Sequence, residues 1–197
     1  MHGVPTLRRR RPNSPMRTVA AFAGGAVAAI IASRLLPPVV AQASGAALAA
    51  AGRDPFDALV EDHRAILTLL DHMAQSPDGA VFARTQRLFR LKRRLAAHAM
   101  AEEDVLYPLL YERAQSASEA KHLYEEHAEM KMHLYQLEQI PKDDPRWRDR
   151  VLELRTLIEG HVRQEEEMEF PKLQSVLDEP GIRRLWAHIQ REKALLL

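Results

Sequence analysis

The sequence contains no cysteine, and that absence removes several classes of site at once. A disulfide framework, a thiolate metal site and a catalytic thiol are all excluded. Any metal ion bound by this protein must therefore be held by nitrogen and oxygen ligands. The sequence also lacks segments in which apolar and polar residues alternate for long enough to form a strand. The chain from residue 54 onward is predicted to be all-α.

The same part of the chain lacks an excess of positive charge. The formal net charge of the whole sequence is +1, but residues 1–54 contain seven arginines and one acid, so the remainder carries a net charge of −5. An acidic body without a basic stripe argues against nucleic acid as its partner. The hydrophobic fraction of 46% and the charged fraction of 28% are typical of a soluble globular domain.

Residues 1–53 differ from the rest of the chain in composition. An arginine-rich start is followed by an apolar run at 18–33 and then by Ala41-Gln42-Ala43, which is the layout of a secretory signal. As an uncleaved helix the apolar run would span about 24 Å, less than the roughly 30 Å of a bilayer core. The alternatives are a cleaved signal, a membrane anchor with contact through residues 18–34, or an N-terminal segment of a cytoplasmic protein. We favour export or membrane tethering over a cytoplasmic location.

Apolar residues recur at three- and four-residue steps through four segments after residue 53, which predicts four helices. We expect them at about 54–76, 80–107, 116–140 and 145–177, and the second has room to continue past Pro108. A break at 178–181 precedes a short fifth helix over 182–197. The predicted domains are a targeting or tether segment (1–53), a four-helix bundle (54–177) and a C-terminal helix (178–197).

One pattern of ligand-type residues occurs twice in the chain. The first copy is Asp62-His63 and then His98-Ala-Met-Ala-Glu102-Glu103; the second is Glu126-His127 and then His161-Val-Arg-Gln-Glu165-Glu166. Residues four apart on a helix share a face, so each His-x3-Glu pair can direct both side chains at one point. The predicted metal ligands are His63, His98, Glu102, His127, His161 and Glu165. This set of nitrogen and oxygen donors suits two bridged ions of iron, manganese or zinc inside a helical bundle.

The neighbouring residues have simpler expected roles. Glu103 and Glu166 lie one position beyond each motif, and we expect them to face water or to support the ligands from outside. Core packing is expected for Tyr107, Tyr124 and Phe170 rather than a redox role. No ligand role is expected for three other histidines on these helices: His72, His122 and His133.

The order of the repeated motif resembles the hemerythrin family, in particular the bacterial hemerythrin-like HHE cation-binding proteins, over residues of about 55–177. The resemblance implies an up-down-up-down four-helix bundle with a non-haem di-iron centre, in which four histidines are terminal ligands and Glu102 and Glu165 bridge the ions. Animal oxygen carriers of this family have a further histidine one turn after the third-helix ligand. Lys131 stands at the matching position here, which argues against stable reversible oxygen carriage.

The function expected from this resemblance is binding or sensing of dioxygen or a related small ligand, such as peroxide or nitric oxide, or the handling of iron. A role in the response to oxidative or nitrosative stress would fit either task. One alternative is a di-iron enzyme with peroxidase-like or ferroxidase-like activity. Another is a redox-inert structural metal-binding bundle. A metal-free bundle is disfavoured, because burying four histidines and two glutamates costs several kcal/mol for each unpaired group.

Overall fold

The computed structural model describes residues 54–196. The sequence-based expectations for residues 1–53, namely a cleaved signal, a membrane anchor or a cytoplasmic N-terminal segment, lie outside the described residues. Within 54–196, the search for a helix long and apolar enough to cross a membrane finds none.

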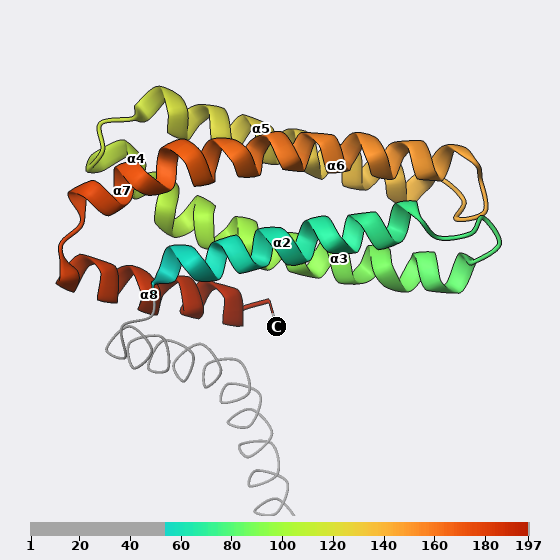
Figure 1. Ribbon diagram of the computed structural model, residues 1–197, viewed down its shortest axis with the longest axis horizontal. Coiled ribbons are helices and arrows are strands. Elements are labelled where there is room, and N and C mark those ends of the chain that lie inside the picture. Colours follow the sequence, from blue (N-terminus) through green and yellow to red (C-terminus); the bar gives the residue numbers. More distant parts are fainter. Residues whose placement is uncertain (1–53, 197) are drawn as a thin grey trace, which may run out of the picture. The chain divides into compact units, whose positions relative to one another are not determined.

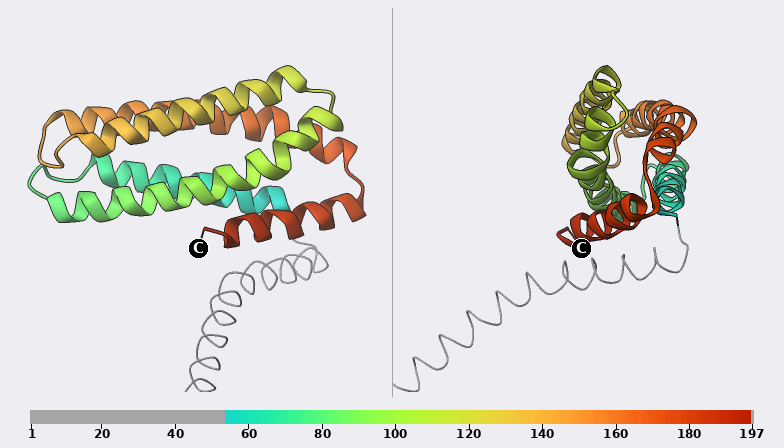
Figure 2. Two further views of the ribbon diagram at one scale, coloured as in Figure 1. Left: turned by 180° about the vertical axis from the view of Figure 1, so that it is seen from behind. Right: turned by 90° about the vertical axis from the view of Figure 1, so that its left-hand side faces the viewer.

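Four helical rods run up and down beside one another and form the body of the described chain (Figure 1 and Figure 2). The second and fourth rods are each interrupted by one five-residue π-helical segment, η1 or η2. The elements in order are α2 (Pro55–Ala74), α3 (Val81–Ala101), η1 (Glu102–Leu106), α4 (Tyr107–Glu112), α5 (Ala117–Gln139), α6 (Arg146–Gln164), η2 (Glu165–Glu169), α7 (Phe170–Val176) and α8 (Glu179–Ala194). The predicted all-α four-helix bundle with an added C-terminal helix is confirmed.

The last helix begins earlier than the sequence pattern predicts. Asp178 is its N-cap, and the Asp178 side chain accepts a hydrogen bond from the Gly181 amide over 2.8 Å. Pro180 lies in the first turn, where its missing N–H leaves no intrahelical hydrogen bond unmade. The expected break at 178–181 is therefore the cap and first turn of α8, and the helix begins at Glu179 rather than Ile182.

The two π-helical segments occupy the same place in both copies of the motif. In η1 the Tyr107 amide donates to the Glu102 carbonyl, and in η2 the Phe170 amide donates to the Glu165 carbonyl. These hydrogen bonds join residues five apart instead of four. Each motif glutamate is therefore paired through its carbonyl with the aromatic residue five positions later. Neither segment is indicated by the apolar spacing of the sequence.

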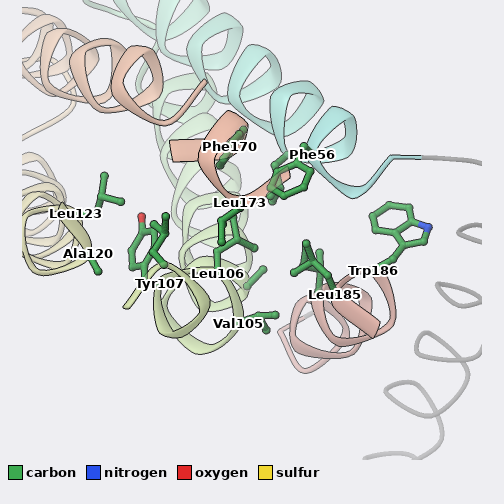
Figure 3. Packing of buried hydrophobic residues seen from close by; sticks show 14 residues of the cluster. Phe56, Val105, Leu106, Tyr107, Ala120, Leu123, Phe170, Leu173, Leu185 and Trp186 are labelled. Atoms are coloured by element: carbon green, nitrogen blue, oxygen red, sulfur yellow. The ribbon is translucent and has the colours of Figure 1, made fainter. Parts of the chain in front are cut away.

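Buried apolar side chains form two clusters, one on each side of the motif residues. The first includes Phe56, Leu106, Phe170 and Leu173, and α8 adds to it through Leu185, Trp186 and Ile189 (Figure 3). The second cluster fills the opposite part of the bundle, from Ile66 on α2 to Trp147 on α6. Each fully buried Leu, Ile or Phe contributes roughly 1.5–3 kcal/mol. These two apolar regions hold the helices in register around a polar middle layer.

Candidate metal centre

The six predicted ligands come together in the middle layer of the bundle. α2, α3, α5 and α6 each contribute one histidine, and η1 and η2 each contribute one glutamate. All six side chains are buried, with at most 4% of any residue exposed. The members of this group are His63, His98, Glu102, His127, His161 and Glu165. Their roles as metal ligands stay a prediction, but the structure gives all of them one shared location.

The donor atoms form two overlapping sets of the size that a metal ion needs. One set joins His63 and His98 to both glutamates, and the other joins His127 and His161 to Glu102, with the atoms of each set within 4.8 Å of one another. Oε1 of Glu102 lies 3.0 Å from Nε2 of His98, and Oε2 of the same carboxylate lies 3.5 Å from Nε2 of His127. Glu102 thus connects the two sets, as a bridging ligand does.

Glu165 also faces both sets of donors. Its Oε2 lies 3.2 Å from Nε2 of His63 and 3.3 Å from Nε2 of His161. Within residues 54–196, several of the donor atoms in the centre have no hydrogen-bond partner, among them both oxygens of Glu102, Oε2 of Glu165 and Nε2 of His63 and His98. Buried polar atoms without partners are costly, and a cation placed among them would satisfy them. The residues present therefore fit two metal ions.

The electrostatics of this layer also favour cations. Burial opposes a positive charge on His63, but the nearby carboxylates of Glu102 and Glu165, 3.7 and 3.2 Å from its Nε2, raise its pKa to about 10. Burial likewise opposes a charge on His161, and the neighbouring carboxylates Glu165 and Glu126 raise its pKa to about 10. Negative charge strong enough to hold protons on imidazoles also attracts a divalent ion, whose binding then releases those protons.

Outer carboxylates hold the far side of the imidazole rings. Oε1 of Glu166 lies 2.9 Å from Nδ1 of His63, and Oε1 of Glu103 lies 2.9 Å from Nδ1 of His127. Glu103 and Glu166 therefore support the ligands from outside, one of the two roles that their place in the sequence predicted. Each reaches the histidine of the other copy, so the two copies are linked crosswise.

The remaining two imidazoles face the residues that precede the first histidine of each copy. Oε2 of Glu126 lies 2.8 Å from Nδ1 of His161, a hydrogen-bond distance. The equivalent residue of the first copy, Asp62, has its Oδ2 3.8 Å from Nδ1 of His98, which is too long for a hydrogen bond. Carboxylates that accept from a metal-ligating imidazole fix the ring and strengthen it as a ligand. We define Asp62, Glu103, Glu126 and Glu166 as the outer carboxylates.

Tyr107 belongs to the centre, although core packing was its only predicted role. Its hydroxyl donates to Oε1 of Glu165 over 2.9 Å and lies 3.0 Å from Nε2 of His127. Burial and the nearby carboxylates raise the pKa of Tyr107 well above its ordinary value, so it stays a hydroxyl and a donor. Phe170 takes the equivalent place in the second copy, stacked on His63 with ring centroids 5.9 Å apart. The aromatic-Pro ends of the motifs were the signal in the sequence that Tyr107 belongs to the centre. The direction of its side chain depends on η1, which changes the helical register directly before it.

The residues given no ligand role lie away from the donor atoms. His72 is exposed, and Nε2 of the exposed His122 lies 3.5 Å from Glu126. His133 contacts Glu129 at 3.9 Å instead of the centre. Lys131 donates to Glu103 over 2.8 Å, so the residue at the position of the extra hemerythrin histidine binds an outer carboxylate.

A cavity of about 340 Å³ reaches the centre from the side of α3 and α5. All four predicted histidine ligands line it. Its walls are mostly apolar, formed by side chains that include Ile66, Leu95, Ala99, Met130, Leu134, Ile158 and Val162. Lys92 and Glu138 also line the cavity, where their partly exposed side chains form an ion pair of 2.7 Å. The cavity is an apolar route by which a small molecule could approach the imidazoles.

A model of the hemerythrin HHE cation binding domain matches residues 54–173. The chain belongs to the hemerythrin HHE cation-binding domain family. The predicted family is thus confirmed, and the buried His and Glu cluster agrees with the metal binding of HHE domains. The match ends before α8, which lies outside the shared domain.

Two further comparisons relate this HHE domain to known proteins. A protein from Nostoc sp. (strain PCC 7120) named DNA nickase is 34% identical over 122 residues, which is 61% of this chain and 34% of the relative. The chain therefore spans about a third of the length of that relative. The crystal structure of a hemerythrin HHE cation binding domain-containing protein from Mycobacterium kansasii, a homologue of Rv2633c, is similar with a TM-score of 0.61. It is 23% identical, and the match covers 72% of this chain and 88% of that protein, so the likeness supports the fold alone.

Proposed function

We propose that the HHE domain of this chain holds a pair of non-haem iron ions through its four buried histidines and two buried glutamates. The donors are nitrogen and carboxylate oxygen, the combination that suits iron more than magnesium or calcium. The carboxylate of Glu102 faces both histidine pairs, as a bridge between two ions requires. Iron bound there would offer exchangeable coordination positions and a change of oxidation state.

We propose further that the centre binds dioxygen or a related small ligand, such as peroxide or nitric oxide. The observation that carries this proposal is the apolar cavity of about 340 Å³ that ends at the four imidazoles. A structural zinc site needs no such route, because structural sites are closed on all sides. Apolar walls admit an apolar diatomic molecule and leave water few hydrogen-bond partners. We expect a ligand-binding or sensing protein in stress defence rather than an oxygen store, because Lys131 supplies no fifth nitrogen.

A second candidate function is turnover of peroxide or ferrous iron. The hydroxyl of Tyr107 favours it, because this group is buried in the centre and donates to Glu165. A positioned hydrogen-bond donor next to the reacting ligand can lower the barrier of a proton-coupled step. Steady consumption of peroxide that is lost in Tyr107→Phe at unchanged iron content would support the enzyme. A spectral change that saturates and reverses would support the binder.

The activity named for the Nostoc relative is not what we propose for this chain. This chain spans about a third of that protein, and its region after residue 54 carries a net charge of −5. We therefore propose a small ligand, and no nucleic acid, as the partner of the HHE domain. We also propose export or membrane tethering through residues 1–53, which N-terminal sequencing of the native protein would test, since cleavage after Ala43 leaves Ser44 first.

The direct test is iron analysis with visible absorption on protein purified from iron-fed cells. We expect nearly two iron ions per chain and a charge-transfer band, both reduced in His98→Ala and in Glu165→Ala. The matched control is His72→Ala, which removes an exposed histidine of α2 and should leave the iron content and the spectrum unchanged. Fewer than about one iron ion per chain in the unaltered protein, or a spectrum that neither substitution changes, would contradict the proposal.

A further inference from the structure

The four imidazoles of the centre are not supported equally. Nδ1 of His63, His127 and His161 each lies within 2.9 Å of an outer carboxylate. The distance from Nδ1 of His98 to Asp62 is 3.8 Å, and Nδ1 of His98 has no hydrogen-bond partner among the residues that the structure describes. One ligand, in the first copy of the motif, therefore lacks the support that the other three have.

Two features around Asp62 accompany the longer distance between Asp62 and His98. Asp62 is one methylene shorter than Glu126, the equivalent residue of the second copy. In addition, Nζ of Lys193 binds Oδ2 of Asp62, the same oxygen that faces His98. Arg94 is a further cation near this carboxylate, 3.9 Å from Oδ1. Lys193 and His98 thus face the same oxygen of Asp62, and Arg94 lies near the other oxygen.

Lys193 comes from α8, which is not one of the four helices of the bundle. Leu185, Trp186 and Ile189 of this helix are buried in the first apolar cluster and attach α8 to the bundle beside α3 and η1. The Lys193 side chain is itself only 14% exposed, so its contact with Asp62 is shielded from water. An ion pair that is shielded in this way is screened less than one on the open surface.

The contact of Lys131 with Glu103, the outer carboxylate that supports His127, can be compared with the contact of Lys193 with Asp62. Lys131 also binds an outer carboxylate, because its Nζ lies 2.8 Å from Oε1 of Glu103. The same oxygen still accepts from His127 at 2.9 Å, and the Lys131 side chain is 61% exposed. Exposed ion pairs are weak, and this one does not displace the carboxylate from its imidazole. The shielded cation from α8 contacts the outer carboxylate that lies 3.8 Å from its imidazole, while the exposed Lys131 contacts one that stays at hydrogen-bond distance.

We propose that Lys193 is a positioning residue that holds Asp62 away from His98 and so weakens His98 as a metal ligand. A carboxylate that accepts from an imidazole N–H makes the opposite nitrogen a stronger donor, and a carboxylate engaged by an ammonium group does this less well. The ion held by His63 and His98 is then the more weakly bound of the two. This inference rests on the proposed two-ion centre and adds that α8 makes the two positions unequal.

The test is a competition titration of the full-length protein with zinc, which binds without redox chemistry, against a chelator of known affinity. We expect two binding steps in the unaltered protein that differ at least about tenfold in affinity. Lys193→Met should tighten the weaker step by about tenfold and leave the stronger one unchanged. Lys193→Arg keeps the cation and should behave as the unaltered protein does. Lys131→Met is the matched control and should change either step by less than about threefold.

A double-mutant cycle separates positioning from a general effect of α8. If Lys193 acts through Asp62, then Lys193→Met should have no effect on zinc affinity in a chain that already carries Asp62→Asn. Proton NMR of the zinc-loaded, nitrogen-15-labelled protein adds a readout at the imidazole itself. Lys193→Met should move the Nδ1 proton signal of His98 downfield, because Asp62 becomes free to accept from it. Far-UV circular dichroism of each variant shows whether α8 stays folded.

Three results would overturn the inference while leaving the metal centre intact. They are two zinc steps of equal affinity in the unaltered protein, zinc affinities in Lys193→Met that match the unaltered protein, and weaker zinc binding in Lys193→Met with α8 folded. Absence of metal uptake by the unaltered protein is a different outcome, because it would contradict the proposed function itself.

Discussion

In the first copy of the motif the aromatic residue after the π-helical segment is Tyr107, and in the second copy it is Phe170. The outer carboxylate before the first histidine is Asp62 in one copy and Glu126 in the other. Close to the proposed ions the copies agree, since each brings two histidines and one glutamate to the middle layer. They differ in the residues that touch those ligands from outside. The residues that repeat are those whose atoms would meet the ions. The residues that differ between the copies surround these ligands, and they make the surroundings of the two proposed ions unequal.

The largest expected effect comes from Glu102, whose two carboxylate oxygens face different histidine pairs. Oε1 and Oε2 of Glu102 face different histidine pairs, so Glu102→Ala should abolish binding of both ions. Glu165→Ala should remove less iron, because Oε1 of Glu165 is engaged by Tyr107 and only Oε2 faces the histidines. Iron content per chain measures both. Equal losses in the two variants would show that the glutamates are equivalent.

The next effect concerns α8, which packs against the first copy. Ile189 is fully buried in the first apolar cluster, so Ile189→Ala should lower the free energy of unfolding by about 2–5 kcal/mol. Leu196→Ala, at an exposed position after the helix, is the control and should cost less than about 0.5 kcal/mol. Urea denaturation measures both changes. A cost for Ile189→Ala similar to that of the control would show that α8 is only loosely attached.

A smaller change should follow when the outer carboxylates are altered one at a time. Glu126 accepts from His161 at 2.8 Å, so Glu126→Gln should weaken binding of the ion in the second copy by roughly tenfold. Asp62→Asn should weaken binding in the first copy less, because Asp62 lies 3.8 Å from His98. Zinc titration gives both affinities. A larger effect for Asp62→Asn would show that Asp62 supports His98 more than Glu126 supports His161, despite the longer distance.

The smallest effect is expected for a substitution that gives both copies the same aromatic residue, phenylalanine, after the π-helical segment. Tyr107→Phe removes the donor to Oε1 of Glu165 and leaves a buried carboxylate oxygen without a partner, which should cost about 1–2 kcal/mol. Tyr124→Phe is the control, because the partly exposed Tyr124 hydroxyl donates to the Glu103 carbonyl, which water can reach in its place. Thermal unfolding of the two variants compares them. Equal costs would mean that Tyr107 contributes packing alone.

Much of the fold followed from the sequence, because apolar spacing and capping residues act locally. The three- and four-residue steps predicted the bundle, and the repeated pattern of one histidine followed by His-x3-Glu predicted the six residues that meet in its middle layer. By the same local criteria Asp178 and Pro180 indicate a break between helices, whereas the structure has them in the N-cap and first turn of α8. A cap and a first-turn proline have the same composition as a loop, and only the hydrogen bond to Gly181 distinguishes them.

What the sequence did not predict depends on hydrogen-bond register and on contacts between distant helices. Pro108 and Pro171 cannot donate to the carbonyl four residues earlier, and each follows a π-helical segment that begins six residues before it. These prolines are the signal in the sequence for the two π-helical segments. The predicted helices, however, have ideal α-helical angles through both motifs. Tyr107 joins the centre only through this altered register. The contact of Lys193 with Asp62 joins residues 131 apart in the chain, and no local pattern indicates it.

The crosswise hydrogen bonds of Glu103 and Glu166 also bear on assembly. Each copy of the motif supplies the carboxylate that steadies a histidine of the other, so neither pair of helices can complete its own ligand geometry. The bundle is thus organised as a dimer of two helical hairpins within one chain. We therefore expect the proposed centre to take up metal only after both hairpins have docked, since a hairpin alone holds no finished site in which to sequester an ion.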